Sequence, residues 1–163
     1  MTSTKTSETI KFKISLYSQY WDKPAITEVF INDVSKTRQE ITSNENDPTI
    51  IEFEHKLLDG EGYKLVIKNC NKDPSQTVVE DGKIVKDQLL FIKEIIIDEI
   101  DIGGLIYEGK YYPEYQEPWA SEQRAEGKEL PEYIKNVTTM GHNGRWELEF
   151  TSPFYMWLLE NLY

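Results

Sequence analysis

The sequence predicts an all-β protein, an antiparallel β-sandwich with one short helix at its C-terminal end. Short apolar segments alternate with polar residues at a period of two through the first two-thirds of the chain, which is typical of strands with one buried face. Clusters of turn-forming residues separate these segments. One long apolar run, residues 88–98, is too apolar for an exposed strand and is expected in the interior.

The composition indicates a chain with a substantial core and an acidic surface. The chain has 163 residues, of which 39% are hydrophobic and 12% aromatic, and its formal net charge is −11. A surface of this charge repels phosphate backbones and anionic lipids, and the lysines are interspersed with carboxylates along the chain. We therefore expect neither nucleic-acid binding nor membrane binding.

The first predicted strands lie before residue 69. The first has apolar residues at every second position, namely Ile10, Phe12, Ile14 and Leu16. Further strands are predicted over residues 26–32, 34–42, 49–55 and 63–68. Residues 43–48 are dense in turn formers and are expected to be a loop.

A long polar connection, residues 69–87, precedes the apolar run and contains a predicted hairpin turn at residues 80–83. Within the run, Leu90 and Ile92 lie on one face of a strand, whereas Ile95 and Ile97 have the opposite parity. This change of parity predicts a β-bulge or kink near Lys93, or two consecutive strands.

After Gly103 the chain becomes aromatic, acidic and rich in proline. A short polar helix is predicted over residues 121–128 and a final strand over 146–150. We expect residues 1–8 to be disordered, 9–104 to form the sandwich, and 105–163 to be an extension packed on the sandwich or on a partner.

The end of the chain predicts a helix over residues 154–162. Ser152 is a favourable N-cap and Pro153 a favourable first helical residue. A helix this short and apolar is stable only when buried, either on its own sandwich or on another subunit. The predicted interface residues form one stripe, namely Phe154, Trp157 and Leu158.

Aromatic residues are the best candidates for ligand binding. Aromatic faces stack on sugar rings, and neighbouring carboxylates and amides bind the hydroxyl groups. The same residues also suit a sandwich core or a hot spot for another protein. The predicted ligand-binding residues are Tyr20, Trp21, Tyr112, Tyr115 and Trp119.

The sequence contains no recognisable catalytic motif. His55 and His142 are the only histidines and do not have the spacing of metal ligands. Cys70 is the only cysteine, which excludes an intrachain disulfide, and no activating base accompanies it in the sequence. We therefore expect a non-catalytic protein.

One part of the sequence follows a known family pattern, carried by Pro24 and by the segments 28–33, 49–53, 62–69 and 87–98. In this pattern residues 24–103 resemble the calcium-dependent carbohydrate-binding modules of the xylan-binding type, a small jelly-roll-like family. The resemblance implies a jelly-roll-like sandwich, a glycan ligand and calcium.

In that family an aspartate at the start of the final strand lies beside the calcium and glycan site. The resemblance places Asp87 at this position, and Asp81 is the expected second oxygen donor. Calcium takes about six to eight oxygen ligands, so two carboxylates do not complete a site. The connection 69–86 is also longer than in the family pattern.

Two functional hypotheses follow. The first is a structural or assembly protein, such as a virion component. It rests on residues 144–160, whose sequence resembles small structural proteins of tailed bacteriophages. Its expected partners are other copies of itself, in an oligomer, or another structural protein. The alternative is a glycan-binding module, with or without calcium. The N-terminus lacks the apolar segment of a secretory signal, so the cytoplasm or a virion is the expected location.

Overall fold

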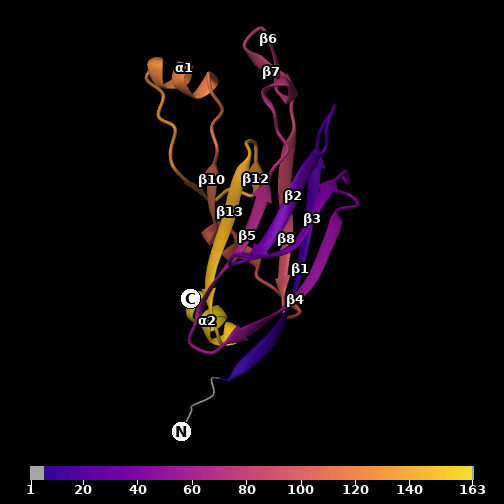
Figure 1. The fold of residues 1–163 in the computed structure, drawn as a ribbon, viewed down its shortest axis with the longest axis vertical. Helices are drawn as coiled ribbons and strands as arrows, with labels where there is room; N and C mark the ends of the chain where they lie inside the picture. Colours follow the sequence, from indigo (N-terminus) through magenta and orange to yellow (C-terminus); the bar gives the residue numbers. More distant parts are fainter. Residues whose placement is uncertain (1–5, 163) are drawn as a thin grey trace.

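The computed structural model describes residues 6–162, which form two antiparallel sheets packed as a β-sandwich (Figure 1). The first sheet has the strand order β12-β8-β1-β4, and β9 also pairs with β8. Its strands are β1 (Ser7–Gln19), β4 (Thr49–Leu58), β8 (Leu89–Ile97), β9 (Ile100–Asp101) and β12 (Thr139–Met140). The predicted all-β sandwich with a short C-terminal helix is confirmed.

The second sheet has the strand order β11-β10-β13-β5-β2-β3. Its strands are β2 (Ala25–Ile31), β3 (Val34–Ile41), β5 (Gly62–Asn69), β10 (Lys110–Pro113), β11 (Ile134–Lys135) and β13 (Gly144–Thr151). A separate hairpin, β6 (Val78–Glu80) with β7 (Lys83–Lys86), stands where the sequence predicts a hairpin turn. Two 3₁₀ helices, Pro74–Gln76 and Gly103–Glu108, connect strands.

The core lies between the two sheets and consists of the alternating apolar residues. Ile14 and Leu16 of β1 are fully buried, as are Leu65 and Ile67 of β5. Trp146 of β13 is the largest fully buried side chain among the described residues. Each such side chain contributes about 1.5–3 kcal/mol when it leaves water, so the alternation provides the main stabilisation of the sandwich.

A β-bulge interrupts β8 at the predicted position. Ser15 of β1 pairs with Glu94, whereas the next residue, Leu16, pairs with Ile92, so Lys93 has no partner in the ladder. The extra residue resets the parity of the strand, and Ile92 and Ile95 are therefore both buried.

The C-terminal third completes both sheets. β13 lies between β10 and β5 in the second sheet, and β12 pairs with β8 in the first. Four segments of the expected extension, β10 to β13, are thus strands of the two sheets, whereas α1 lies outside them. At the other end of the chain, β1 begins at Ser7, within the segment expected to be disordered, while residues 1–5 lie outside the described part.

The two α-helices lie at opposite ends of the sandwich (Figure 1). α1 spans Trp119–Ala125, slightly earlier than predicted, and α2 spans Phe154–Asn161. Within the described residues, no helix is both long enough and apolar enough to cross a membrane.

α2 packs on its own sandwich. Phe154 and Leu158 are buried in the core of this chain, and the Trp157 ring lies 6.2 Å from that of Phe150. Phe154 and Leu158 therefore expose almost no surface that could form the expected interface with another subunit. The large hydrophobic residues left exposed here are Tyr155, Met156 and Leu159 of α2 and Leu162, which follows the helix.

The start of α2 is also capped differently from the prediction. The N-cap residue is Pro153, not Ser152. The Phe154 N–H donates to Glu8 Oε1 at 2.7 Å, and the Ser152 hydroxyl donates to the same oxygen at 3.1 Å. A carboxylate from β1 thus provides the cap, and it also complements the helix dipole.

Candidate functional site

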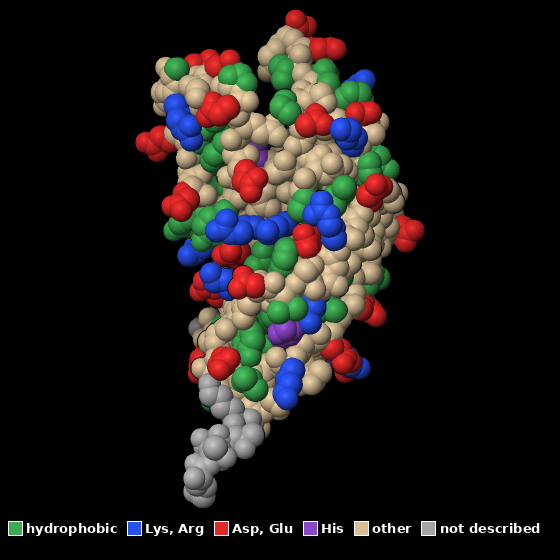
Figure 2. Space-filling view, in the orientation of Figure 1, with side chains coloured by type: hydrophobic (Ala, Val, Ile, Leu, Met, Phe, Trp, Pro, Cys, Tyr) green, Lys and Arg blue, Asp and Glu red, His purple; other side chains and the backbone are tan. Residues whose placement is uncertain are grey.

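The candidate site lies at the end of the sandwich from which α1 and the β6–β7 hairpin project (Figure 1). Figure 2 shows that these two projections stand apart and leave a notch between them. We call this region the apical notch and define it by Lys72 and Asp87 on the hairpin side and by Tyr115, Trp119 and His142 on the α1 side.

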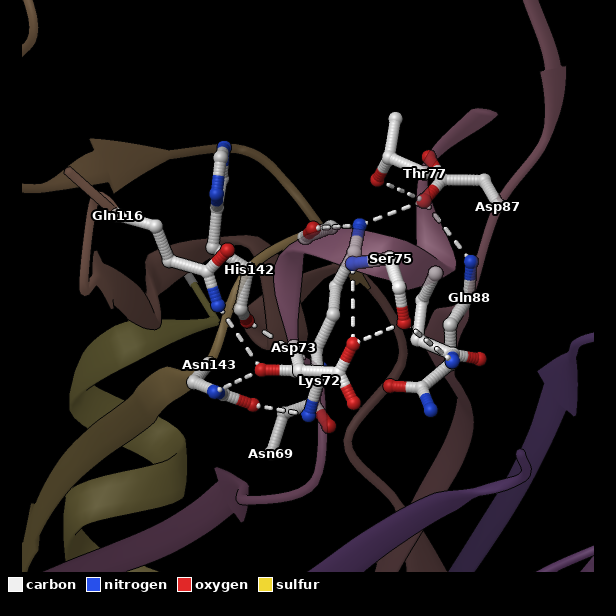
Figure 3. Close-up of polar contacts among 12 residues, drawn as sticks. Asn69, Lys72, Asp73, Ser75, Thr77, Asp87, Gln88, Gln116, His142 and Asn143 are labelled. Carbon is white, nitrogen blue, oxygen red and sulfur yellow. Dashed lines mark hydrogen bonds and ion pairs between the residues drawn. The ribbon is translucent and has the colours of Figure 1, made fainter. Parts of the chain in front are cut away.

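A buried ion pair forms the hairpin side of the notch (Figure 3). Lys72 Nζ lies 2.6 Å from Asp87 Oδ1, and only 6% of the Lys72 side chain is exposed. The same ammonium donates to the Gly141 carbonyl. Asp87 Oδ1 also accepts hydrogen bonds from Thr77 Oγ1 at 2.7 Å and from the Gln88 N–H at 2.8 Å. The buried ammonium and the largely buried carboxylate are therefore paired and hydrogen-bonded, as the loss of water requires.

The backbone of Lys72 joins three segments that are distant in the sequence (Figure 3). Its N–H donates to Asn143 Oδ1 at 2.8 Å, and Asn143 Nδ2 donates back to the Lys72 carbonyl at 2.6 Å. Gln116 Nε2 donates to the same carbonyl at 2.9 Å. The β5–β6 connection, the β12–β13 turn and the segment before α1 are thus held together, which makes the floor of the notch rigid.

Three rings form an aromatic cluster on the α1 side. The ring centroid of Trp119 lies 6.2 Å from that of Tyr115 and 5.3 Å from that of His142, and Tyr115 lies 5.3 Å from His142. Trp119 is 40% exposed, so this cluster offers an indole surface to a ligand. The Tyr115 hydroxyl donates to the Pro131 carbonyl at 2.7 Å, which fixes the ring.

His142 is held as a neutral side chain. Burial lowers its pKa, and the nearby Lys72 charge lowers the pKa further, whereas Asp87 acts weakly in the opposite direction. Its backbone is clamped by Tyr111, whose hydroxyl donates to the His142 carbonyl at 2.6 Å and accepts from the His142 N–H at 2.9 Å. At neutral pH the imidazole is therefore an aromatic contact with hydrogen-bonding nitrogens rather than a cation.

The structure distributes the five predicted aromatic residues over three places. Only Tyr115 and Trp119 lie together in the apical notch. Tyr20 and Trp21 lie in the loop after β1, where the Trp21 Nε1–H donates to the Gln76 carbonyl at 2.9 Å. Tyr112 lies on the second sheet, beneath the guanidinium of Arg145 at 4.1 Å from the ring centroid.

The residues around Asp87 do not fit calcium. Asp81 is exposed in the β6–β7 turn, and the whole of β7 separates it from Asp87. Asp87 Oδ1 already accepts three hydrogen bonds, one of them from the Lys72 ammonium, which stands where a cation would pair with this carboxylate. In the part of the chain that the structure describes, no group of three or more His, Cys, Asp or Glu side chains is placed to hold a metal ion.

Sequence reasoning missed Lys72, His142 and Asn143. The Gly-His-Asn-Gly stretch indicates only a turn, and Lys72 lies in a polar connection without a motif. Their roles depend on tertiary contacts over about seventy residues, such as the Lys72–Asn143 pair. The resemblance alone pointed to Asp87, which does lie in the notch.

Comparison with known proteins gave matches only among solved structures. No protein-family model and no curated protein sequence matches this chain. The solved structures include the calcium-dependent carbohydrate-binding module vCBM60, with 4% identity and a TM-score of 0.48 over 85% of this chain and 88% of that one. They also include vCBM60 in complex with galactobiose, with 5% identity and a TM-score of 0.45 over 84% and 95% of the two chains. The first of these structures is described as a calcium-dependent carbohydrate-binding module, the class of protein that the sequence pattern resembles.

Proposed function

We propose that this chain is a non-catalytic glycan-binding module and that the apical notch is its site. The observation that carries the proposal is the partly exposed Trp119 ring, held by Tyr115 and His142 next to a rigid polar floor. An indole face binds the apolar face of a sugar ring, while amide and imidazole groups of the notch bind its hydroxyls.

The rigidity of the notch supports a binding role. Its polar groups are fixed by hydrogen bonds before any ligand arrives, for example between Lys72, Gln116 and Asn143. A preorganised surface loses little conformational entropy on binding, which improves affinity for weakly bound ligands such as sugars.

The state of Asp87 supports binding without catalysis and without calcium. Its Oδ1 is occupied by Lys72, Thr77 and Gln88, so this carboxylate serves as a structural anchor of the notch rather than as an acid or base. Lys72 supplies the positive charge that a metal ion would otherwise supply. Glycan binding is therefore expected to be insensitive to a chelator.

A glycan array followed by calorimetry tests this function. The array includes galactobiose and longer neutral glycans, and calorimetry with the strongest ligand compares wild type, Trp119→Ala and Tyr107→Ala. Tyr107 is a matched control because it is an exposed aromatic residue in the 3₁₀ helix Gly103–Glu108, outside the notch. The proposal expects Trp119→Ala alone to lose at least about tenfold in affinity, which is about 1.4 kcal/mol. The proposal would be contradicted if all three proteins bound with equal affinity, or if no glycan on the array bound the wild-type protein.

A second candidate function is assembly, including the virion role suggested by the sequence. The observation that favours it is an exposed apolar stripe at the end of the chain, where Met156 and Leu159 of α2 and Leu162 directly after it are 58%, 61% and 53% exposed. Apolar stripes of this kind are typical of contact surfaces. Light scattering tests it: the assembly function expects an oligomer that Leu159→Glu dissociates, and a monomer at all concentrations would contradict it.

A further inference from the structure

The outer face of the second sheet carries a row of charged and aromatic side chains that crosses five strands. The register pairs Arg38 of β3 with Glu28 of β2, and Glu28 with Lys68 of β5. Lys68 is paired with Arg145 of β13, and Arg145 with Tyr112 of β10. With strands about 4.8 Å apart, this row is roughly 19 Å long.

Cations of this face lie over aromatic rings. Lys68 Nζ is 4.8 Å from the ring centroid of Phe30, and the Arg145 guanidinium is 4.1 Å from that of Tyr112. At the edge of the sheet, Lys110 Nζ lies 4.9 Å from the ring centroid of Tyr133. These contacts hold the long side chains flat against the sheet and keep their charged ends in place.

Lys68 and Arg145 are like charges directly opposite each other on neighbouring strands. Such a pair is destabilising unless an anion lies between the two charges. The carboxylates nearby pair with other cations or with one member of this pair: Glu28 binds Arg38 at 3.3 Å, and Glu147 binds the Nε of Arg145 at 2.7 Å. Glu147 also lies 3.9 Å from Lys64 Nζ, so Lys68 is the cation of the pair that these ion pairs leave unneutralised. Among the residues that the structure describes, no carboxylate lies within ion-pair distance of Lys68.

A surface groove runs over this cation pair. Its lining combines three cations with two carboxylates and with apolar or amide side chains, namely Lys64, Lys68, Arg145, Asp33, Glu147, Phe30, Val66 and Asn32. Lysines that are interspersed with carboxylates along the sequence thus come together on one face when the strands pair. Figure 2 shows Lys and Arg side chains in a band across the middle of the molecule, although the chain as a whole carries a net charge of −11.

We propose that this groove binds an acidic polysaccharide, with a sugar carboxylate between Lys68 Nζ and the free amino groups of Arg145. The charge complementarity and the length of the row fit an extended chain with carboxylates at intervals. Nucleic acid fits poorly, because its dense phosphates meet an overall acidic protein. A peptide strand binds at a sheet edge through unpaired backbone groups, whereas β5 and β13 are paired on both sides. The site is separate from the apical notch and extends the glycan-binding function to a second, charged ligand.

Affinity electrophoresis with polygalacturonate tests this inference. The variants are Lys68→Gln/Arg145→Gln and, as a control with the same change in net charge, Lys11→Gln/Lys56→Gln on the first sheet. Their far-UV spectra and melting temperatures verify folding, and the single variant Lys68→Gln provides a second test with a milder change. The inference expects the first double variant to bind polygalacturonate at least about tenfold more weakly and Lys68→Gln to bind it several-fold more weakly. The control is expected to bind like wild type.

The outcomes separate this site from the notch. Trp119→Ala is expected to retain polygalacturonate binding even where it loses binding of neutral glycans. A result that contradicts the proposal for one site therefore leaves the proposal for the other site intact. The inference is overturned if the Lys68/Arg145 double variant binds like wild type or if the control loses as much affinity. It is also overturned if poly-glutamate binds as tightly as polygalacturonate, because an acidic protein is then the better partner.

Discussion

Lys72 Nζ and Asp87 Oδ1 lie 2.6 Å apart, with only 6% and 15% of the two side chains exposed. The pair joins the connection after β5 to the start of β8, and so fixes the base of the apical notch. A buried ion pair is costly to break, because the remaining partner is left charged in a medium of low polarity.

Lys72→Met is therefore expected to destabilise the protein by about 3–5 kcal/mol, since it leaves the Asp87 carboxylate buried with only neutral donors. The shift of the urea midpoint measures this loss. Lys23→Met is the control, because the Lys23–Asp73 pair is exposed and its loss is expected to have little effect. Unchanged stability of Lys72→Met, or recovery of its stability on addition of calcium, would contradict the role given to this ammonium.

Glu8→Ala is expected to lower stability by about 0.5–2 kcal/mol, the usual effect of removing a helix cap. The carboxylate accepts the Phe154 N–H at 2.7 Å, and the N-cap residue Pro153 makes no side-chain capping bond of its own. Thermal unfolding compares it with Glu52→Ala, which removes an exposed carboxylate from β4. If both variants melt at the same temperature, Glu8 does not cap α2.

Trp157→Ala is expected to lower the free energy of unfolding by less than the roughly 3–5 kcal/mol of a fully buried tryptophan, because its half-buried ring packs against Phe150 and Phe154. Removal of residues 153–163 also deletes the buried Leu158, and the loss then approaches the whole stability of a domain, about 5–15 kcal/mol. Calorimetric melting is the measurement, and Leu159→Ala, which truncates an exposed side chain, is the control. A truncated protein that melts like the full chain would show that α2 is not a core element.

Acidification is expected to destabilise the fold in the range where histidine titrates. Burial lowers the pKa of both His142 and His55 in the folded state, so the unfolded chain binds more protons below about pH 6.5. The free energy of unfolding is therefore highest above that pH, where both histidines are neutral in the folded and unfolded states. It decreases as the pH falls toward the lowered pKa values of the folded state. Urea midpoints between about pH 7.5 and about pH 5.5 measure this slope, which His142→Gln is expected to reduce and not abolish. An unchanged slope in His142→Gln would show that His142 is not held neutral.

Much of the fold is predictable from local sequence, because apolar residues at every second position of a strand show which of its faces is buried. The alternation in residues 10–16 predicted β1, and the parity change near Lys93 predicted the bulge in β8. The hairpin turn at residues 80–83 was also evident from its turn residues.

The site residues were less predictable because they meet only after the strands have paired. Asp87 was found through a family pattern, but its partner Lys72 was not, since nothing local distinguishes that lysine from the other lysines of the chain. The Lys68–Arg145 pair likewise exists only because β5 lies beside β13, which no local pattern reveals.

The most direct measurement of glycan binding in the apical notch is an NMR titration of the tryptophan indole N–H signals, with a chelator present throughout. The chain has four tryptophans, of which Trp119 lies in the notch and the fully buried Trp146 serves as an internal reference. Glycan binding in the notch predicts that the strongest array ligand shifts the Trp119 signal in a saturable way and leaves the Trp146 signal unchanged. A Trp119 signal that does not move, or that moves only when calcium replaces the chelator, would contradict it.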